Sequence, residues 1–229
     1  MRPYIEKVSI KGFKTIADLK DFNFRSLNIL IGPNGAGKSN LVSFFRMMSW
    51  LVAGEFQEYV IKVCGGSGNL LHDGPERTDC VKAALTIKTD VGKNEYRFSA
   101  GHASGDTLVF LNEEYRFSNV RFATEANWIS LPTAQMESAL LKAAEAENKT
   151  AQVIRSLMQR VKVFQFHNTS FTSRMRNRFN PEDGRHLKED AGNLSTFLLR
   201  LKRDKPAYYS KIVATTQLVL PFFRDYFYL

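Results

Sequence analysis

The sequence predicts an α/β fold, in which an antiparallel β meander follows the first helix and a helical lobe comes last. Three observations support this prediction. A strand-like run leads through a glycine-rich loop into a helix-like run within residues 26–51. Short runs of alternating apolar and polar residues follow between residues 80 and 118. Helix-forming residues then dominate from residue 133 onward.

The composition is that of a globular chain. Its 229 residues are enough for one large or two small domains, with 44% hydrophobic and 24% charged residues. The formal net charge of +9 permits an anionic partner such as nucleic acid but does not establish one. Cys64 and Cys80 are the only cysteines and form no CxxC pair, which disfavours a disulfide framework and a structural metal.

Two absences indicate a cytoplasmic protein without a membrane partner. No apolar run of the sequence reaches the roughly 18–20 residues that a membrane span requires. The first residues, "MRPYIEKVSI", lack the apolar core of a signal peptide. We therefore expect a cytoplasmic location.

The first predicted elements surround the glycine-rich loop. Residues 5–13 alternate like a half-buried strand, and "SLNILI" at 26–31 is a second strand signal that leads directly into the loop. After the loop, apolar residues recur at helical spacing, and Gly54 favours a stop. These apolar residues are Leu41, Phe44, Phe45, Met48 and Leu51.

Short strands and then helices are predicted after residue 64. The strand-like runs are 80–88, 94–99, 107–111 and 114–118. The sequence "EYRFS" occurs twice, in the second and fourth of these runs, which we interpret as two similar strands of one meander. Residues 133–160 are rich in helix formers, and 161–166 favour another strand. Two further helices are expected, one containing Leu194 to Leu201 and one from Pro206 to Pro221.

The glycine-rich loop matches the phosphate-binding pattern G-x-x-x-x-G-K-[ST] at every fixed position. Its residues are Gly32, Pro33, Asn34, Gly35, Ala36, Gly37, Lys38 and Ser39. Glycines let successive backbone N–H groups turn toward phosphate oxygens, and the N-terminus of the next helix adds partial positive charge. Lys38 can reach the β- and γ-phosphates, and the Ser39 hydroxyl can bind Mg²⁺. The sequence therefore predicts ATP and Mg²⁺ as cofactors, with Lys38 as a catalytic residue.

Further motifs distinguish among classes of phosphate-loop protein. The only Asn-Lys pair, in "NKTA" at 148–151, lacks the Asp of an N-K-x-D element, which disfavours a GTPase. The segment "GPNGAGKSN", preceded by "IEKVSIKGFK" and "LNILI", resembles the RecF/SMC/OLD branch of the ABC-type ATPases. Within that branch it is similar to the bacterial predicted AAA-family ATPases, as are the later "FQFHNTS" and "LKEDAGNLSTFLLRL". The resemblance implies an ABC-type head with a mixed sheet that holds the P-loop, a meander beside it and a helical lobe.

The resemblance also implies a subdivision of the chain. The expected parts are a P-loop ATPase core lobe at 1–63, an antiparallel meander at 64–132, a helix and strand returning to the core at 133–169, and an incomplete helical lobe at 170–229. Two ATP-sandwiched heads would form a homodimer or higher oligomer, and a nuclease or toxin would be a partner.

Three more site residues follow from the resemblance. Asn40 extends the phosphate loop by one position. Gln165 matches the Q-loop glutamine that touches Mg²⁺ and the attacking water, although His167 and Asn168 compete for this role and an ordinary edge-strand glutamine is the alternative. Lys14 matches a basic position near the nucleotide, with a solvated lysine as the alternative.

Two parts of a hydrolytic ABC-type site are missing from the sequence. A Walker B strand ends in Asp-Glu, and the nearest match, "LVFLNEE" at 108–114, has Asn112 in place of the Asp, so a hairpin turn at Asn112-Glu113 is the better explanation. The signature motif is absent as well, since "NLSTF" at 193–197 keeps only Leu-Ser. We expect an N-terminal half of an ATPase that binds ATP without turning it over by itself.

A loop rich in arginine and aromatic residues suggests a second function. Arg174, Arg176 and Arg178 alternate in "SRMRNRF", which is typical of a nucleic-acid contact or of a solvated loop. The leading hypothesis is the head of a DNA-transaction or anti-phage defence ATPase. The alternatives are a non-hydrolysing nucleotide sensor and, less favoured, a transporter ATPase.

Overall fold

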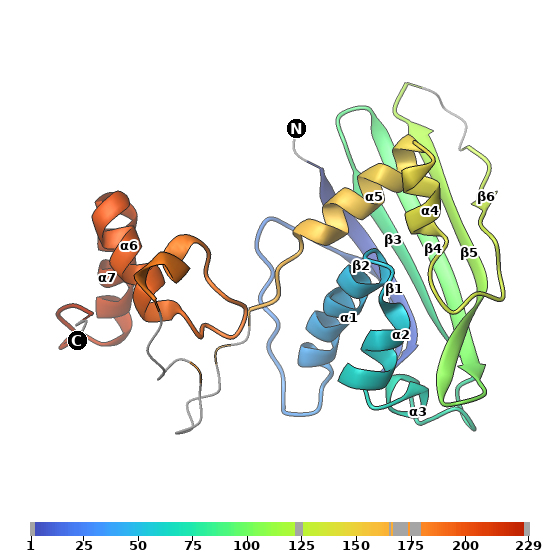
Figure 1. Ribbon diagram of the computed structural model, residues 1–229, viewed down its shortest axis with the longest axis horizontal. Helices are drawn as coiled ribbons and strands as arrows, with labels where there is room; N and C mark the ends of the chain where they lie inside the picture. Colours follow the sequence, from blue (N-terminus) through green and yellow to red (C-terminus); the bar gives the residue numbers. More distant parts are fainter. Residues whose placement is uncertain (1–2, 122–125, 165, 167–173, 175–179, 227–229) are drawn as a thin grey trace. The chain divides into compact units, whose positions relative to one another are not determined.

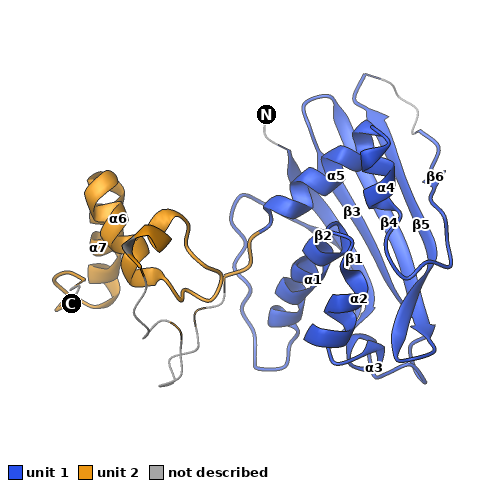
Figure 2. Ribbon diagram, viewed as in Figure 1, with its two compact units in different colours: residues 1–161 blue, residues 162–229 orange. Residues whose placement is uncertain are grey.

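The computed structural model describes residues 3–121, 126–164, 166, 174 and 180–226. The chain divides into two compact units, residues 1–161 and 162–229 (Figure 2). The finer subdivision at residues 63, 132 and 169 stays a prediction. None of the helices in the described part is both long and apolar enough to cross a membrane.

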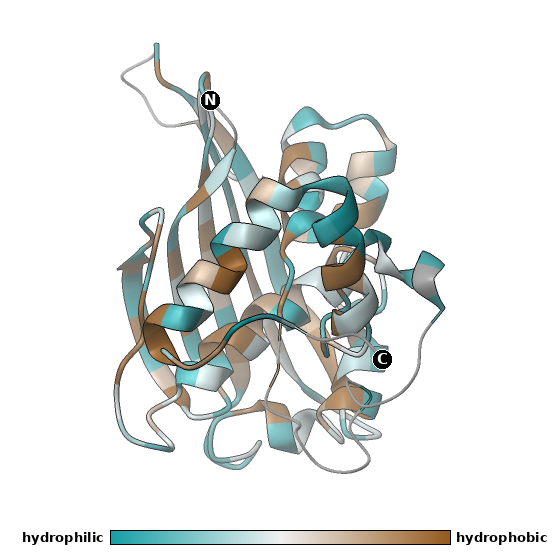
Figure 3. Cartoon of the chain, turned by 90° about the vertical axis from the view of Figure 1, so that its left-hand side faces the viewer, coloured by the Kyte–Doolittle hydropathy of each residue, from teal (hydrophilic) through white to brown (hydrophobic). Residues whose placement is uncertain are grey.

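The first unit is built on a six-stranded sheet with the strand order β2-β1-β3-β4-β5-β6 (Figure 1). Its strands are β1 (Tyr4–Phe13), β2 (Ile16–Asn23), β3 (Cys80–Lys88), β4 (Gly92–Ala103), β5 (Thr107–Asn119) and β6 (Ile129–Ser130). All neighbouring strands are antiparallel. Hydrophobic and hydrophilic residues alternate along the strands, because successive side chains point to opposite faces (Figure 3).

Helices cover one face of this sheet (Figure 1). They are α1 (Lys38–Leu51), α2 (Phe56–Glu58), the π-helix η1 (Tyr59–Val63), α3 (Ser67–Leu70), α4 (Leu140–Glu145) and α5 (Lys149–Arg160). The core contains Phe44 and Met48 from α1, Ile154 from α5, and Tyr96 and Phe110 from the sheet, all fully buried. Each large apolar side chain contributes about 1.5–3 kcal/mol by leaving water, so this face holds the unit together.

The meander differs from its prediction at β5. The predicted runs 107–111 and 114–118 form one continuous strand, and the predicted hairpin turn at Asn112-Glu113 is wrong. The register shows why: Ser99 pairs with Asn112 but Ala100 pairs with Phe110, which leaves Leu111 as a bulge. A bulge inserts one residue and bends the strand without reversing it.

The two "EYRFS" segments are neighbouring strands of one meander, as predicted. They pair with each other in antiparallel register, so that Glu95 faces Arg116 and Arg97 faces Glu114. Each arginine Nε lies 2.6 Å from the carboxylate opposite. The ring of Trp128 lies 3.9 Å from the Arg97 guanidinium and 4.5 Å from that of Arg116. The repeat therefore produces two reciprocal ion pairs, and both of their arginines make a cation–π contact with the same Trp128 ring.

The strand predicted at residues 26–31 is wrong. These residues belong to no strand or helix, and Leu27, Ile29 and Ile31 are 74%, 73% and 91% exposed. A strand needs a neighbour to satisfy its backbone N–H and C=O groups, and no strand in the described ranges pairs with this segment. The parallel part of the expected mixed sheet is likewise not found among the described strands.

The helical prediction for 133–160 holds in part. Residues 133–139 are not helical, and α4 and α5 are separated at Glu147, which has a φ of 62°. Asn148 then caps α5, because its side-chain oxygen accepts a hydrogen bond from the Ala151 N–H at 3.0 Å. The strand predicted at 161–166 is wrong for residues 161–164 and 166, which form no strand, while residue 165 lies outside the described residues.

The second unit contains the 3₁₀ helix η3 (Pro181–Arg185), α6 (Leu194–Asp204) and α7 (Pro206–Val219). The two helices predicted here are confirmed. Asn193, which is fully buried, holds the preceding loop together. Its amide nitrogen donates to the carbonyls of Asp183 and His186 at 2.5 and 2.8 Å, and its oxygen accepts from the Lys188 N–H at 2.8 Å. The Asn of "NLSTF" therefore has a structural explanation.

Candidate functional site

The phosphate loop folds as its glycines require. Gly35 and Gly37 have φ values of +86° and +82°, a left-handed conformation that other residues rarely adopt. The Ala36 N–H donates to the Pro33 carbonyl at 3.3 Å, which closes the turn between them. No neighbouring atom lies within 4 Å of where a Cβ on Gly35 would sit, so this glycine serves the backbone conformation and not a close contact.

Helix α1 begins directly at the loop. Gly37 is its N-cap, and no side chain caps the helix at this end. The Gly37 carbonyl accepts hydrogen bonds from the N–H groups of Asn40 and Leu41, both at 3.0 Å. The first amide groups and the positive end of the helix dipole are therefore available to an anion. The helix is anchored by five buried residues, Leu41, Phe44, Met47, Met48 and Leu51.

Lys38 bends back over the loop that precedes it. Its Nζ donates to the carbonyl oxygens of Gly32 and Pro33 at 2.8 and 2.6 Å. These two hydrogen bonds hold the ammonium group against the backbone at the start of the loop. A phosphate bound there would offer negatively charged oxygens in place of neutral carbonyls, which adds Coulombic attraction between opposite charges to the hydrogen bonds. Ser39 follows on α1 and is exposed, so its hydroxyl is accessible to a metal ion.

The turn between β1 and β2 lies against the phosphate loop. The Asn40 side-chain nitrogen donates to the Thr15 Oγ1 at 2.7 Å, and a Cβ on Gly37 would lie 3.2 Å from the same oxygen. Sequence reasoning missed Thr15, because nothing distinguishes a threonine in a short turn. The structure explains the place of Asn40: its side chain ties α1 to the turn.

Lys14 lies in the same turn, next to Thr15. Its φ is +49°, its backbone carbonyl contacts the His72 Nδ1 at 2.6 Å, and its Nζ lies 5.7 Å from the centre of the Phe13 ring. A contact between Lys14 and the nucleotide stays a prediction.

An open hollow of about 490 Å³ lies beside the phosphate loop. Lys38, Gly37 and Ala36 line one part of it, and Thr15, Leu41, residues of β2 and segment 29–31 line the rest. This lining is mostly apolar but includes the Asp18 carboxylate, which is paired with Lys20. The exposed apolar side chains of that segment border this hollow, so the site is not closed by the residues described.

Glu113, the carboxylate of the nearest Walker B match, is a structural residue. It is fully buried under the helices. Its carboxylate accepts hydrogen bonds from the Tyr96 hydroxyl at 2.5 Å, from the Ala139 N–H at 2.9 Å and from the Ser138 hydroxyl. Burial, followed by the Glu113 charge, raises the pKa of Tyr96 well above its usual value, which keeps this hydroxyl a proton donor.

Several predicted site residues lie outside the described residues, namely Gln165, His167, Asn168, Arg176 and Arg178. Arg174 is described, and its guanidinium lies 3.3 Å from the Asp190 carboxylate. The metal role of Gln165 therefore stays a prediction. Among the residues that are described, no group of three or more His, Cys, Asp or Glu side chains could hold a metal ion.

Comparison with known proteins agrees with the geometry of the loop. A family described as AAA domain matches residues 7–207 of the chain. The chromosome partition protein Smc of Halothermothrix orenii is 43% identical over 44 residues, 19% of this chain and 4% of that protein. The Smc protein of Fusobacterium nucleatum is 33% identical over 89 residues, 38% of this chain and 7% of that protein. The chain thus spans only a small part of the length of these relatives.

Proposed function

The chain belongs to the AAA domain family, and its resemblance to the RecF/SMC/OLD branch of ABC-type ATPases is confirmed. From this premise we propose that it is the ATP-binding head of an ATPase that acts in DNA transactions or anti-phage defence. The observation that supports ATP binding is the phosphate loop, with its left-handed glycines, the uncapped start of α1 and the Lys38 ammonium. The relatives' name, chromosome partition protein, favours DNA as the partner.

In this proposal each loop residue has a defined role. Backbone N–H groups of residues 35–39 bind the phosphates, and Lys38 exchanges the Gly32 and Pro33 carbonyls for β- and γ-phosphate oxygens. The Ser39 hydroxyl binds Mg²⁺, which neutralises charge on the phosphates when it is bound. Gln165 at the metal and Lys14 near the nucleotide are proposed on the resemblance alone.

Hydrolysis requires a carboxylate that prepares the attacking water, and Asp18, the carboxylate that borders the hollow, is paired with Lys20. No carboxylate of the described part of the chain hydrogen-bonds to the phosphate loop, and the apolar segment 27–31 lacks a strand partner. We propose that further strands bring the catalytic carboxylate and that a second head, in a homodimer or higher oligomer, closes the site. A nuclease or toxin would act as the partner of the assembly.

The direct test is a titration of the full chain with a fluorescent ATP analogue and Mg²⁺. Lys38→Ala removes charged hydrogen bonds of about 1.5–3 kcal/mol in total, so the affinity should fall by a factor of about 10 to 150. Lys62→Ala, which removes an exposed lysine of the π-helix, is the control and should bind like the parent. Unchanged affinity of Lys38→Ala would overturn the assignment of the loop.

Steady-state phosphate release tests the hydrolytic part. We expect little turnover from this chain alone and Lys38-dependent turnover once the missing strands are supplied. Robust Lys38-dependent hydrolysis by residues 1–229 alone would contradict the proposal. If the chain binds ATP but does not hydrolyse it even when the further strands are supplied, the chain is a nucleotide sensor.

A further inference from the structure

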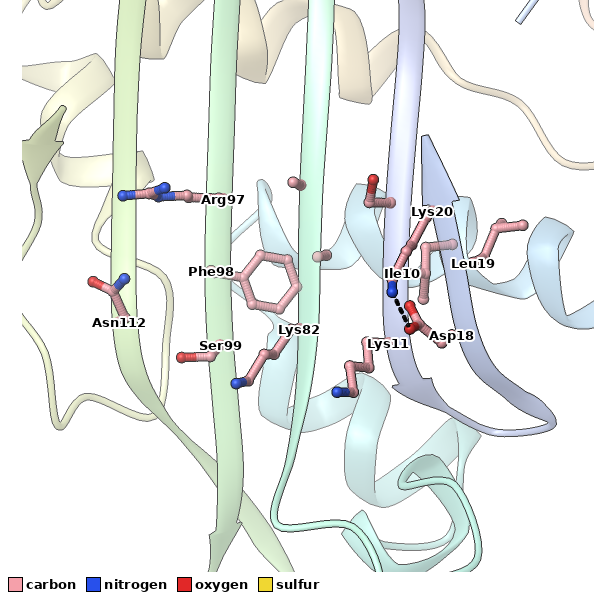
Figure 4. A pocket seen from close by; sticks show the side chains of 13 residues that line it. Ile10, Lys11, Asp18, Leu19, Lys20, Lys82, Arg97, Phe98, Ser99 and Asn112 are labelled. Atoms are coloured by element: carbon pink, nitrogen blue, oxygen red, sulfur yellow. Dashed lines mark ion pairs between the residues drawn. The ribbon is translucent and has the colours of Figure 1, made fainter. Parts of the chain in front are cut away.

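The sheet face opposite the helices carries lysines in an unfavourable arrangement. Lys11 on β1 and Lys82 on β3 are direct cross-strand partners. Both side chains are exposed on this face, side by side on adjacent strands (Figure 4). Like charges directly opposite each other in an antiparallel pair are destabilising, so the fold alone gives no reason for this pair.

Neither lysine is neutralised by a nearby carboxylate. Asp18 is the cross-strand partner of Lys11 on its other side, but its carboxylate pairs with the Lys20 Nζ at 3.1 Å. Over the described ranges of the chain, Lys11 and Lys82 form no ion pair. Two positive charges on this face thus lack an internal counterion.

The lysines border an open hollow of about 430 Å³ that spans β2, β1, β3, β4 and β5. Lys20 and Arg97 also line the hollow, but their charges are paired with Asp18 and Glu114, so Lys11 and Lys82 carry its unpaired positive charge. Hydrogen-bonding side chains continue the row, since Lys82 pairs across the strands with Ser99, and Ser99 with Asn112. Phe98, the one aromatic residue lining the hollow, is only 3% exposed and offers no ring for base stacking. The hollow therefore suits phosphate groups better than bases.

We propose that this face, centred on Lys11 and Lys82, binds the phosphodiester backbone of double-stranded DNA without reading its sequence. Adjacent strands lie about 4.8 Å apart, and duplex DNA carries one charge for about every 1.7 Å of its axis, so both lysines can contact phosphates together. The choice of DNA among polyanions rests on the proposed function; the anion site itself rests on the pairing of the lysines. The proposal involves none of the residues of the arginine-rich segment around Arg174.

The test measures binding of the full chain to a fluorescein-labelled duplex of random sequence by anisotropy, between about 50 and 200 mM salt. In Lys11→Gln/Lys82→Gln the dissociation constant should rise on the order of tenfold or more, and the salt slope should fall by about two units. The matched control, Lys62→Gln/Lys142→Gln, removes the same charge from the π-helix and α4 and should retain both values. Tryptophan fluorescence in urea checks that each variant folds.

Each outcome decides the inference. Equal losses in both double variants would show a nonspecific charge effect, and no loss in either would place DNA elsewhere; both results overturn it. Binding of inorganic tripolyphosphate to the parent, measured by calorimetry, with no binding of the duplex would replace DNA by a small anion and would also overturn it. ATP titration of the same variants separates the two proposals. Loss of DNA binding with ATP binding intact supports the inference, whereas failure of Lys38→Ala to affect ATP binding refutes only the proposed function.

Discussion

Replacing Glu113 by alanine is expected to destabilise the first unit severely while leaving the nucleotide site unchanged. The carboxylate is fully buried and accepts three hydrogen bonds, from the Tyr96 hydroxyl, the Ser138 hydroxyl and the Ala139 N–H. Its removal leaves these donors buried without an acceptor. It also disconnects the segment before α4 from β5, since Ser138 and Ala139 belong to that segment.

The magnitude follows from these three contacts. A buried donor left without a partner costs about 1–3 kcal/mol, although water entering the cavity satisfies part of the loss, so we expect a decrease of about 3–6 kcal/mol in the free energy of unfolding. A typical domain has about 5–15 kcal/mol in total. Glu113→Gln should fall between the parent and Glu113→Ala, because the amide keeps one acceptor oxygen but presents an N–H₂ group to neighbouring donors.

Urea unfolding followed by tryptophan fluorescence measures this effect in the first unit alone, because the two tryptophans, Trp50 and Trp128, both lie within residues 1–161. The control is Glu58→Ala, which removes an exposed carboxylate paired with Lys62 at 2.8 Å and should cost at most about 0.5 kcal/mol. A loss for Glu113→Ala no larger than that of the control would refute the structural role. Loss of Lys38-dependent phosphate release in a protein that hydrolyses ATP, at unchanged stability, would instead make Glu113 catalytic.

Two further predictions concern charge. Lys82→Glu should raise the free energy of unfolding by about 0.2–1 kcal/mol in urea, because it turns the cross-strand repulsion with Lys11 into an opposite-charge pair; a loss of stability would contradict the like-charge argument. In the second unit, the Lys202 ammonium and then the Tyr209 hydroxyl lower the pKa of Asp225 from 3.8 to about 2. This group therefore stabilises the unit above its unfolded pKa, and the contribution disappears as the pH falls through about 2. Asp225→Asn should lose this acid-dependent step in the helical circular dichroism signal, and an unchanged acid transition would show that the pair is not formed.

Local patterns in the sequence predicted the elements that depend on local chemistry. The phosphate loop and α1 follow from the glycine positions and from apolar residues at helical spacing, and both are found as predicted. Strands β1 and β3 follow from alternation. Strand β2 was missed and 26–31 was wrongly expected to be a strand, because alternation says which residues favour an extended backbone but not whether a neighbouring strand is available to pair with it.

The sequence by itself determined the family and the conformation of the phosphate loop, since the loop is one continuous segment whose backbone conformation its own glycines set. The tertiary structure alone decided which distant residues meet. It made Glu113 a buried hydrogen-bond acceptor. The bulge at Leu111 shifts the alternation of side chains along β5 by one residue, so that Glu113 lies on the buried face of the sheet. It joined Asn40 to Thr15 and placed Lys11 opposite Lys82, contacts that depend on chain packing and strand register. Register is a property of two strands together, so neither strand's sequence contains it alone.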